Sequence, residues 1–96
     1  MNKYEIMFIV RSDIEEEARK NVVKTLEKTL TDNKATITLS KELGQREFAQ
    51  PIKKFKSGFY YLYNIEANDT AAIDEFSRVA KIEENVIRHL VLNIEK

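Results

Sequence analysis

The sequence is 96 residues long, with 43% hydrophobic and 33% charged residues, and it contains two glycines, one proline and no cysteine. This composition predicts one folded domain over residues 1–96, and it excludes disulfides, thiolate metal sites and cysteine nucleophiles. Lysine plus arginine equal aspartate plus glutamate at 16 each, so no overall positive field marks a nucleic-acid partner.

The first predicted element is a strand over Lys3–Val10, which is rich in β-formers. Near its end, residues on both faces of the strand are apolar, as is typical of a central strand. The stretch Ser12-Asp13-Ile14-Glu15 then matches a capping box, so we predict that a helix begins there. The helix should end near Asn33, because asparagine can take the left-handed conformation that often ends a helix. Its apolar stripe repeats every four residues, at Ile14, Ala18, Val22, Leu26 and Leu30.

Two further strands are predicted to form a hairpin. Ala35–Leu39 alternates apolar residues with threonine, and the disturbed alternation around Gly44 predicts a bulge or bend within a long second strand. Pro51 lacks an amide donor and should end that strand or lie at its exposed margin. Lys53–Ser57 is then the connecting loop, and Gly58–Ala67, which is rich in aromatic and branched residues, is the third strand.

The remaining chain predicts a helix and a last strand. Asn68–Thr70 supplies helix caps, and Val86–Ile94 is the strand. The helix between them places Ile73, Phe76, Val79 and Ala80 on one face. The order β-α-β-β-α-β with right-handed crossovers predicts a ferredoxin-like α+β fold, in which both helices cover one face of a four-stranded antiparallel sheet. The uncovered face is a physical reason to expect a partner, and its candidate residues are Met7, Ile9, Tyr60 and Leu62.

No residue pattern predicts catalysis. His89, the single histidine, is interpreted as a partly buried strand residue or an RNA contact. Acylphosphatases share the predicted architecture, but they need a glycine-containing phosphate loop where this chain has Val10–Asp13. The acidic run Glu15–Glu17 is attributed to the helix dipole rather than to a metal. We therefore predict no catalytic residue, metal, cofactor or small-molecule substrate.

Charge is segregated along the chain, although the total is balanced. The stretch Lys41–Lys56 carries five basic residues against Glu42 and Glu47. Its lysines at 53, 54 and 56 fit phosphate contacts and an ordinary solvated hairpin tip equally well. Ser57–Tyr63 half-matches an RNA-recognition-motif strand, whose aromatics stack on bases, but core packing is the favoured interpretation. No apolar run approaches the roughly 18 residues of a membrane span, which favours a cytoplasmic location without a membrane partner.

Three stretches, Tyr4-Glu5, Glu42–Ile52 and Glu84–Leu90, carry a resemblance to a known family, and Glu42–Ile52, with its frame of glycine, basic and proline positions, is the most specific of them. With them, the sequence resembles the S6 family of bacterial small-subunit ribosomal proteins over essentially its whole length. The frame positions kept here are Gly44, Arg46, Ala49, Pro51, Ile52, Lys54, Gly58 and Val86-Ile87-Arg88. Glu47, Phe48 and Gln50 replace the usual basic residue, leucine and tyrosine, and a carboxylate at 47 is expected to weaken phosphate contacts made by Arg46.

The resemblance implies a structural protein that binds the central domain of small-subunit (16S) ribosomal RNA as a heterodimer with small-subunit protein eighteen during assembly. Carried over by position, Arg46, Lys54 and Arg88 are the expected RNA contacts. Electrostatic help is expected from Lys3, Lys53 and Lys56. The proposed partner-protein interface is Phe48, Tyr60 and Leu62, which core packing explains about equally well.

Two other functions remain open from the sequence. One is a free-standing RNA-recognition-type domain that binds single strands by stacking through Phe59 or Tyr61. The other is a ferredoxin-like regulatory module that senses a ligand or forms a homodimer through its sheet.

Overall fold

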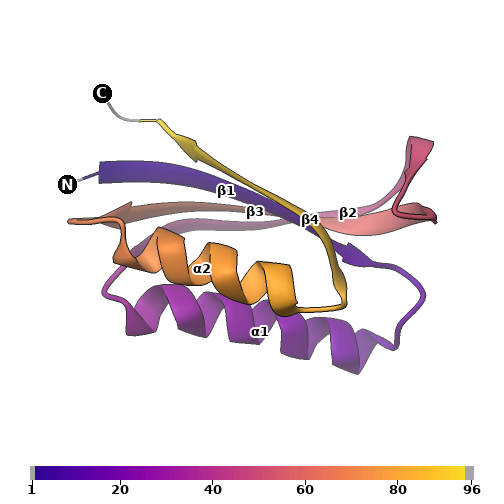
Figure 1. The fold of residues 1–96 in the computed structure, drawn as a ribbon, viewed down its shortest axis with the longest axis horizontal. Coiled ribbons are helices and arrows are strands. Elements are labelled where there is room, and N and C mark those ends of the chain that lie inside the picture. The colour runs from indigo at the N-terminus through magenta and orange to yellow at the C-terminus, as the bar shows by residue number, and fades with distance from the viewer. Residues whose placement is uncertain (1, 95–96) are drawn as a thin grey trace.

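The computed structural model describes residues 2–94 and contains six elements in the predicted order. They are β1 (Asn2–Arg11), α1 (Glu16–Asp32), β2 (Thr36–Ile52), β3 (Phe55–Ala67), α2 (Ala71–Ile82) and β4 (Val86–Asn93). The sheet is antiparallel with the order β2-β3-β1-β4, and both helices lie against one face of it (Figure 1). The ferredoxin-like fold and the central position of β1 are therefore confirmed. Residues 1, 95 and 96 of the predicted domain lie outside the described residues.

The core lies between the helices and one face of the two central strands. The Phe8 ring of β1 stacks on Tyr61 and Tyr63 of β3, with centroids 5.2 and 5.7 Å apart, and it meets Phe76 of α2 at 6.0 Å. Burial of each such side chain contributes about 1.5–3 kcal/mol to folding. The four-residue stripe of α1 is confirmed in its central and last turns, where the buried residues are Val22, Leu26 and Leu30.

The predicted start of the first helix is wrong by three residues, because the N-cap position is Glu15 rather than Ser12. The helix begins at Glu16 after an extended Glu15 that makes no side-chain cap, and Arg19 N–H donates to Glu15 O at 3.0 Å. The Ser12 hydroxyl does not cap a helix, because it is hydrogen-bonded to the Ser57 hydroxyl of β3 at 2.8 Å. A contact between distant segments therefore replaces the local capping box.

The end of α1 also differs in detail from the prediction. Asn33 is the C-cap residue with φ −99°, and the left-handed conformation belongs to Lys34, with φ 67°. The Asn33 side chain donates to Thr29 O at 2.8 Å, which holds it against the last turn. Ala35 N–H then donates to Leu30 O at 3.1 Å, so the chain reverses one residue later than expected.

The β2–β3 hairpin confirms the bulge and corrects the loop. The register shifts between Glu42 and Gly44, and Gly44 has φ 90°, a conformation that glycine adopts without strain. The edge strand β2 ends one residue after the exposed Pro51. Lys53 and Lys54, with φ 50° and 72°, form a two-residue turn, and β3 begins at once. Positive φ at both positions is the geometry of a tight hairpin turn, so the predicted loop over 53–57 is much shorter than expected.

The second helix and last strand follow the prediction closely. The Asp69 carboxylate accepts from Ala71 N–H at 3.0 Å, and Thr70 occupies the cap position without a side-chain cap. Phe76 and Ala80 are buried, with Ile73 and Val79 packed beside them. In residues 2–94, no helix is long and apolar enough to cross a membrane.

Candidate nucleic-acid and protein interface

The candidate site is the sheet face that carries no helix (Figure 1). Because neighbouring strand residues point to opposite faces and Phe8 packs in the core, Met7 and Ile9 point to the open face. The register aligns Ile9 with Tyr60 of β3 and Arg88 of β4, and it aligns Met7 with Leu62 and Leu90. The four residues predicted for this face are therefore confirmed there. Two cross-strand rows of mainly apolar side chains form its centre.

Side chains from the strand margins close over the middle of this face. Ile9 is only 6% exposed although no helix covers it. A hollow of about 230 Å³ beside it is lined by residues of β1, β3, β4 and the end of β2, including Ile52 and Leu90. We call the apolar set on this face the open-face patch; it comprises Met7, Ile9, Phe48, Ile52, Tyr60, Leu62 and Leu90.

The three residues predicted to contact a protein partner lie on this patch. Phe48 packs edge-to-face on Tyr60, with ring centroids 6.1 Å apart. Leu62 follows two positions along β3, on the same face. All three are half-buried, so each retains surface that a partner can cover. Their role in partner binding stays a prediction.

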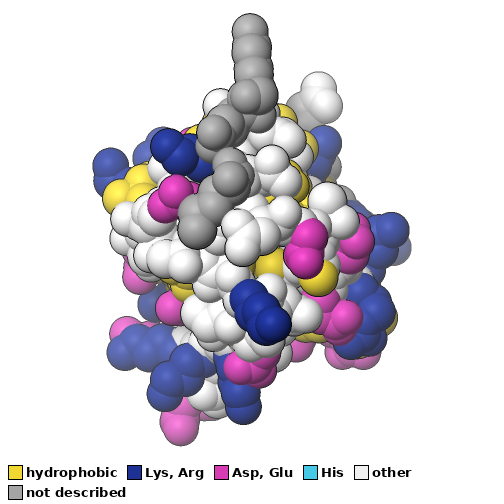
Figure 2. Space-filling view, turned by 90° about the vertical axis from the view of Figure 1, so that its left-hand side faces the viewer, with side chains coloured by type: hydrophobic (Ala, Val, Ile, Leu, Met, Phe, Trp, Pro, Cys, Tyr) yellow, Lys and Arg dark blue, Asp and Glu magenta, His cyan; other side chains and the backbone are white. Residues whose placement is uncertain are grey.

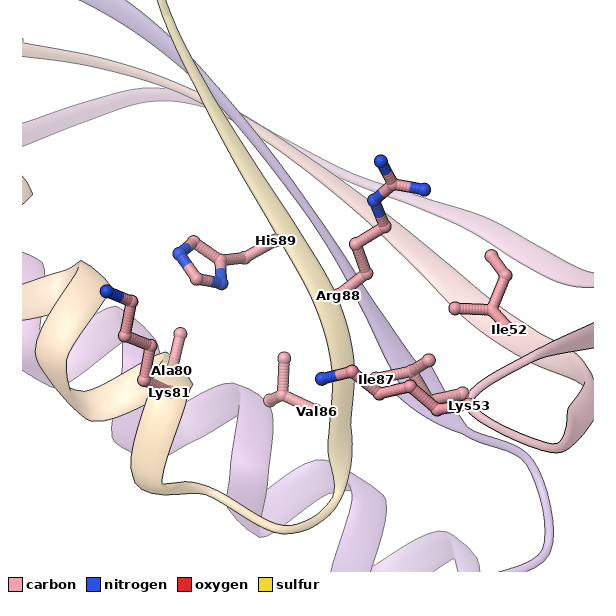
Figure 3. Close-up of a pocket in the computed structure, with 8 residues that line it drawn as sticks. All are labelled: Ile52, Lys53, Ala80, Lys81, Val86, Ile87, Arg88 and His89. Carbon is pink, nitrogen blue, oxygen red and sulfur yellow. The ribbon is translucent and has the colours of Figure 1, made fainter.

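Both arginines that were predicted to contact RNA border the patch. Arg88 is exposed beside Ile9, and its guanidinium points away from α2 toward the side of Ile52 (Figure 3). Arg46 is exposed and pairs in register with Gly58. Glu47 pairs with the next residue of β3, so strand alternation directs it to the other face, and no ion pair joins Arg46 to Glu47 within residues 2–94. Glu47 therefore lowers the local positive charge from the opposite face of the strand, and its expected weakening of phosphate contacts stays a prediction.

The four predicted lysines are not all brought together. Lys53 and Lys54 form the exposed hairpin turn, and Lys56 is exposed on the first residues of β3. Lys3 lies at the opposite end of β1, across from Glu66, about 20 Å along the strand from Ile9. At the end of the molecule that carries both termini, basic and acidic side chains are mixed, with apolar side chains showing between them (Figure 2). The geometry therefore groups the hairpin lysines with the two arginines and leaves Lys3 apart.

The aromatic residues required for base stacking face the core. Tyr61 is 5% exposed, and burial raises the pKa of its hydroxyl. The Arg19 guanidinium carbon lies 3.8 Å from the centroid of the Phe59 ring, which covers that ring from the helix side. Tyr61 is buried and Phe59 is half-buried beneath Arg19, so the structure supports the core interpretation of these two rings and disfavours base stacking through them.

His89 is a half-buried strand residue on the helix-covered face. Its ring lies edge-to-face against Phe76, with centroids 6.0 Å apart. Burial, together with the charges of Lys81 and Lys53, holds the pKa of His89 below its usual value. No group of three or more His, Cys, Asp or Glu side chains that could hold a metal exists in the part of the chain described here.

Sequence reasoning missed Ile52, Leu90 and Lys81 as site residues. Leu90 is 50% exposed, and its alternation with Arg88 on one strand was a usable signal. Ile52 is the last residue of β2 and lines the hollow beside Ile9. Lys81 is the basic residue of the last turn of α2, and only the fold brings it beside β4.

Comparison with known proteins adds family evidence. The family model described as ribosomal protein S6 matches residues 3–93. The crystal structure of 30S ribosomal protein S6 from Thermotoga maritima is 29% identical with a TM-score of 0.90, and the match covers 96% of this chain and 86% of that one. The P2 domain of the chemotaxis kinase CheA from the same organism, solved in complex with the response regulator CheY, has a TM-score of 0.59 at 11% identity, covering 97% of this chain and 98% of that one. The second likeness reflects the fold alone.

Proposed function

The chain belongs to the ribosomal protein S6 family, and from that premise we propose that it binds the central domain of small-subunit ribosomal RNA jointly with small-subunit protein eighteen. The family is structural and non-enzymatic, and it belongs to the small ribosomal subunit. The proposed place of action is the subunit during its assembly in the bacterial cytoplasm. The single observation that carries the proposal is the open-face patch bordered by Arg46 and Arg88.

The patch supports a protein partner because a helix-free apolar surface is costly to leave in water. Leu90 and Leu92 of β4 are 50% and 47% exposed, and they extend the apolar surface along the edge of the sheet. Covering such area contributes about 25 cal/mol per Å². Phe48 and Tyr60 supply aromatic contact area, which is enriched at protein interfaces. A partner seated there would bury side chains that this chain alone cannot.

The charges support RNA binding that depends on the partner. Arg46, Arg88, Lys53, Lys54 and Lys56 offer only a few phosphate contacts, and each contact adds about 0.9 to the slope of log affinity against log salt. A protein with zero net charge has no general attraction to RNA to supplement them. Joint binding with a second protein supplies the missing free energy.

The test measures the affinity of this chain for a transcript of the central-domain RNA, with and without protein eighteen, at two salt concentrations. Weak, salt-sensitive binding alone and at least tenfold tighter binding with the partner are expected. Equal affinity in both conditions would contradict the joint mechanism. A stable homodimer that ignores RNA would instead favour the regulatory-module function.

A further inference from the structure

A second pocket lies on the other side of β4 from the open-face patch. It has a volume of about 420 Å³, within the range of roughly 300–1,000 Å³ that is common for ligand sites. It opens where the β2–β3 turn, the C-terminal end of α2 and the start of β4 meet (Figure 3). Its lining residues are Ile52, Lys53, Ala80, Lys81, Val86, Ile87, Arg88 and His89.

The lining is basic in a chain with balanced charge. Four of its eight residues are Lys53, Lys81, Arg88 and His89, and none of the eight is acidic. Lys53 and Lys81 take part in no ion pair within residues 2–94. The acidic residues of the α2–β4 connection are directed elsewhere: the Glu83 carboxylate accepts from Asn85 N–H at 3.2 Å, and the charge of Glu84 acts on Arg11.

The side chains are arranged around an apolar floor. Lys81 and the His89 ring lie on the α2 side of β4, and the Lys53 amine approaches beside Val86 and Ile87 from the hairpin turn (Figure 3). Arg88 points to the opposite side of the strand, toward the open-face patch (Figure 3). Ala80, Val86 and Ile87 are buried, so the cations stand over a surface of low polarity. Electrostatic attraction to an anion is stronger over such a surface than in bulk water.

We propose that this pocket binds a backbone phosphate of the RNA, which Lys53, Lys81 and His89 contact. The proposal rests on the proposed function, and it specifies where one RNA strand lies on the protein. A phosphate matches the site because lysine ammonium and imidazolium groups are donors without acceptors, and no carboxylate in the lining repels the anion. Arg88, on the other side of the same strand, can hold a neighbouring phosphate. The RNA backbone would then cross the exposed edge of β4, and the open-face patch, apart from Ile52, which also lines the pocket, would stay free for the protein partner.

Phosphate binding has a pH signature at His89. The charged groups that face its ring are Lys81 from α2 and Lys53 from the turn, while β1 presents the uncharged Phe8 and α2 also presents Phe76. Both lysines disfavour the imidazolium in the free protein. A bound phosphate reverses that balance and raises the pKa of His89, so binding takes up a proton. RNA affinity should therefore rise as pH falls from 7.5 to 5.5.

The test compares Lys81→Met, His89→Gln and the matched control Lys24→Met, which alters an exposed lysine of α1 outside both surfaces. RNA binding with protein eighteen present is measured at pH 5.5 and 7.5 over a salt series. Lys81→Met should weaken binding about three- to tenfold and reduce the salt slope by about one. His89→Gln should remove the extra tightening at low pH, and Lys24→Met should match the unaltered protein.

A second readout does not require the RNA. Titration with inorganic phosphate, followed by the NMR signals of the His89 ring, should shift those signals in the unaltered protein and leave them nearly unchanged in Lys81→Met. Failure of the unaltered protein to bind RNA even with protein eighteen would overturn the proposed function. Normal RNA binding by Lys81→Met and His89→Gln, with unchanged salt slope and pH profile, would overturn the pocket alone.

Discussion

Gly58 of β3 lies against Ile9 of β1 so closely that residue 58 has no room for a side chain. A Cβ atom there would stand 2.5 Å from Ile9 Cγ2, 3.0 Å from the Val10 carbonyl oxygen and 3.2 Å from Phe48 Cζ. The missing side chain leaves room for the Ile9 side chain and the Phe48 ring, which both lie close to this position. The packing of the open-face patch therefore depends on this glycine.

Gly58→Ala should lower the free energy of unfolding by about 1–3 kcal/mol, because the added methyl overpacks a closed site. Urea denaturation measures the change. In a double-mutant cycle, Ile9→Ala should relieve part of this cost by removing the Cγ2 atom, and strictly additive effects would contradict the steric explanation.

Gly44→Ala should also destabilise the domain, for a different reason. Nothing lies within 4 Å of a Cβ at this position, but its φ is 90°, and an L-residue is strained there by about 1–2 kcal/mol. The same urea measurement applies, and Ile9→Ala should not relieve this cost. Relief by Ile9→Ala would show that the two glycines act through one contact.

Tyr63→Phe should cost about 0.5–1.5 kcal/mol, because the Tyr63 hydroxyl is buried and donates to Glu27 Oε1 at 2.9 Å. Burial and the Glu27 charge both raise the pKa of Tyr63, so the hydroxyl stays protonated throughout the neutral range. Thermal unfolding of Tyr63→Phe, Glu27→Ala and the double variant gives the coupling. The double variant should lose little more stability than the more destabilised of the two single variants. If the stability losses of the single variants add fully in the double variant, the hydrogen bond contributes nothing.

His89 should make the protein less stable in mild acid. Its pKa in the folded state is below that of the unfolded chain, about 6.5, because burial and two lysines oppose its charge. The unfolded state therefore binds more protons in this window, and stability falls as pH drops from about 6.5 toward the folded pKa. Thermal unfolding of His89→Gln between pH 7.5 and 5 should show a smaller decrease. An identical decrease in the variant would assign the effect to carboxylates.

Leu90→Ser should weaken the complex with protein eighteen by about tenfold, since burial of a leucine contributes roughly 1.5–3 kcal/mol. Ile82→Ser is the matched control, because Ile82 is 66% exposed on α2, in the layer opposite the open-face patch. Isothermal titration calorimetry should find normal affinity for the control. An equal loss of affinity in both variants, or no loss in either, would show that the partner does not bind the open face.

The periodic parts of this fold were predictable because burial repeats at regular spacing. The spacing of Val22, Leu26 and Leu30 predicted the buried stripe of α1, and the disturbed alternation at Gly44 predicted the bulge. The start of α1 was not predictable, because the Ser12 hydroxyl is bound by Ser57, 45 residues away. The residues around Ser12 in the sequence do not indicate the hydrogen bond to Ser57.

The sequence predicted site residues only where they lie within a single strand. Tyr60 and Leu62 were candidates for the open face from the apolar pattern of β3, and Arg88 was expected only from the family resemblance. The Lys53–Lys54 turn was missed because no glycine or asparagine marks its two positive φ angles. The basic pocket was missed because Lys53, Lys81 and His89 come from three elements, and only the packed structure brings them together.

The central claim, that this chain is a structural component of the small ribosomal subunit, is tested most directly by sucrose-gradient sedimentation of a native cell extract at moderate salt. The protein should sediment with the small subunit and move to the top of the gradient only when the subunit is dissociated. Recovery at the top of the gradient while the subunits remain intact would contradict the account.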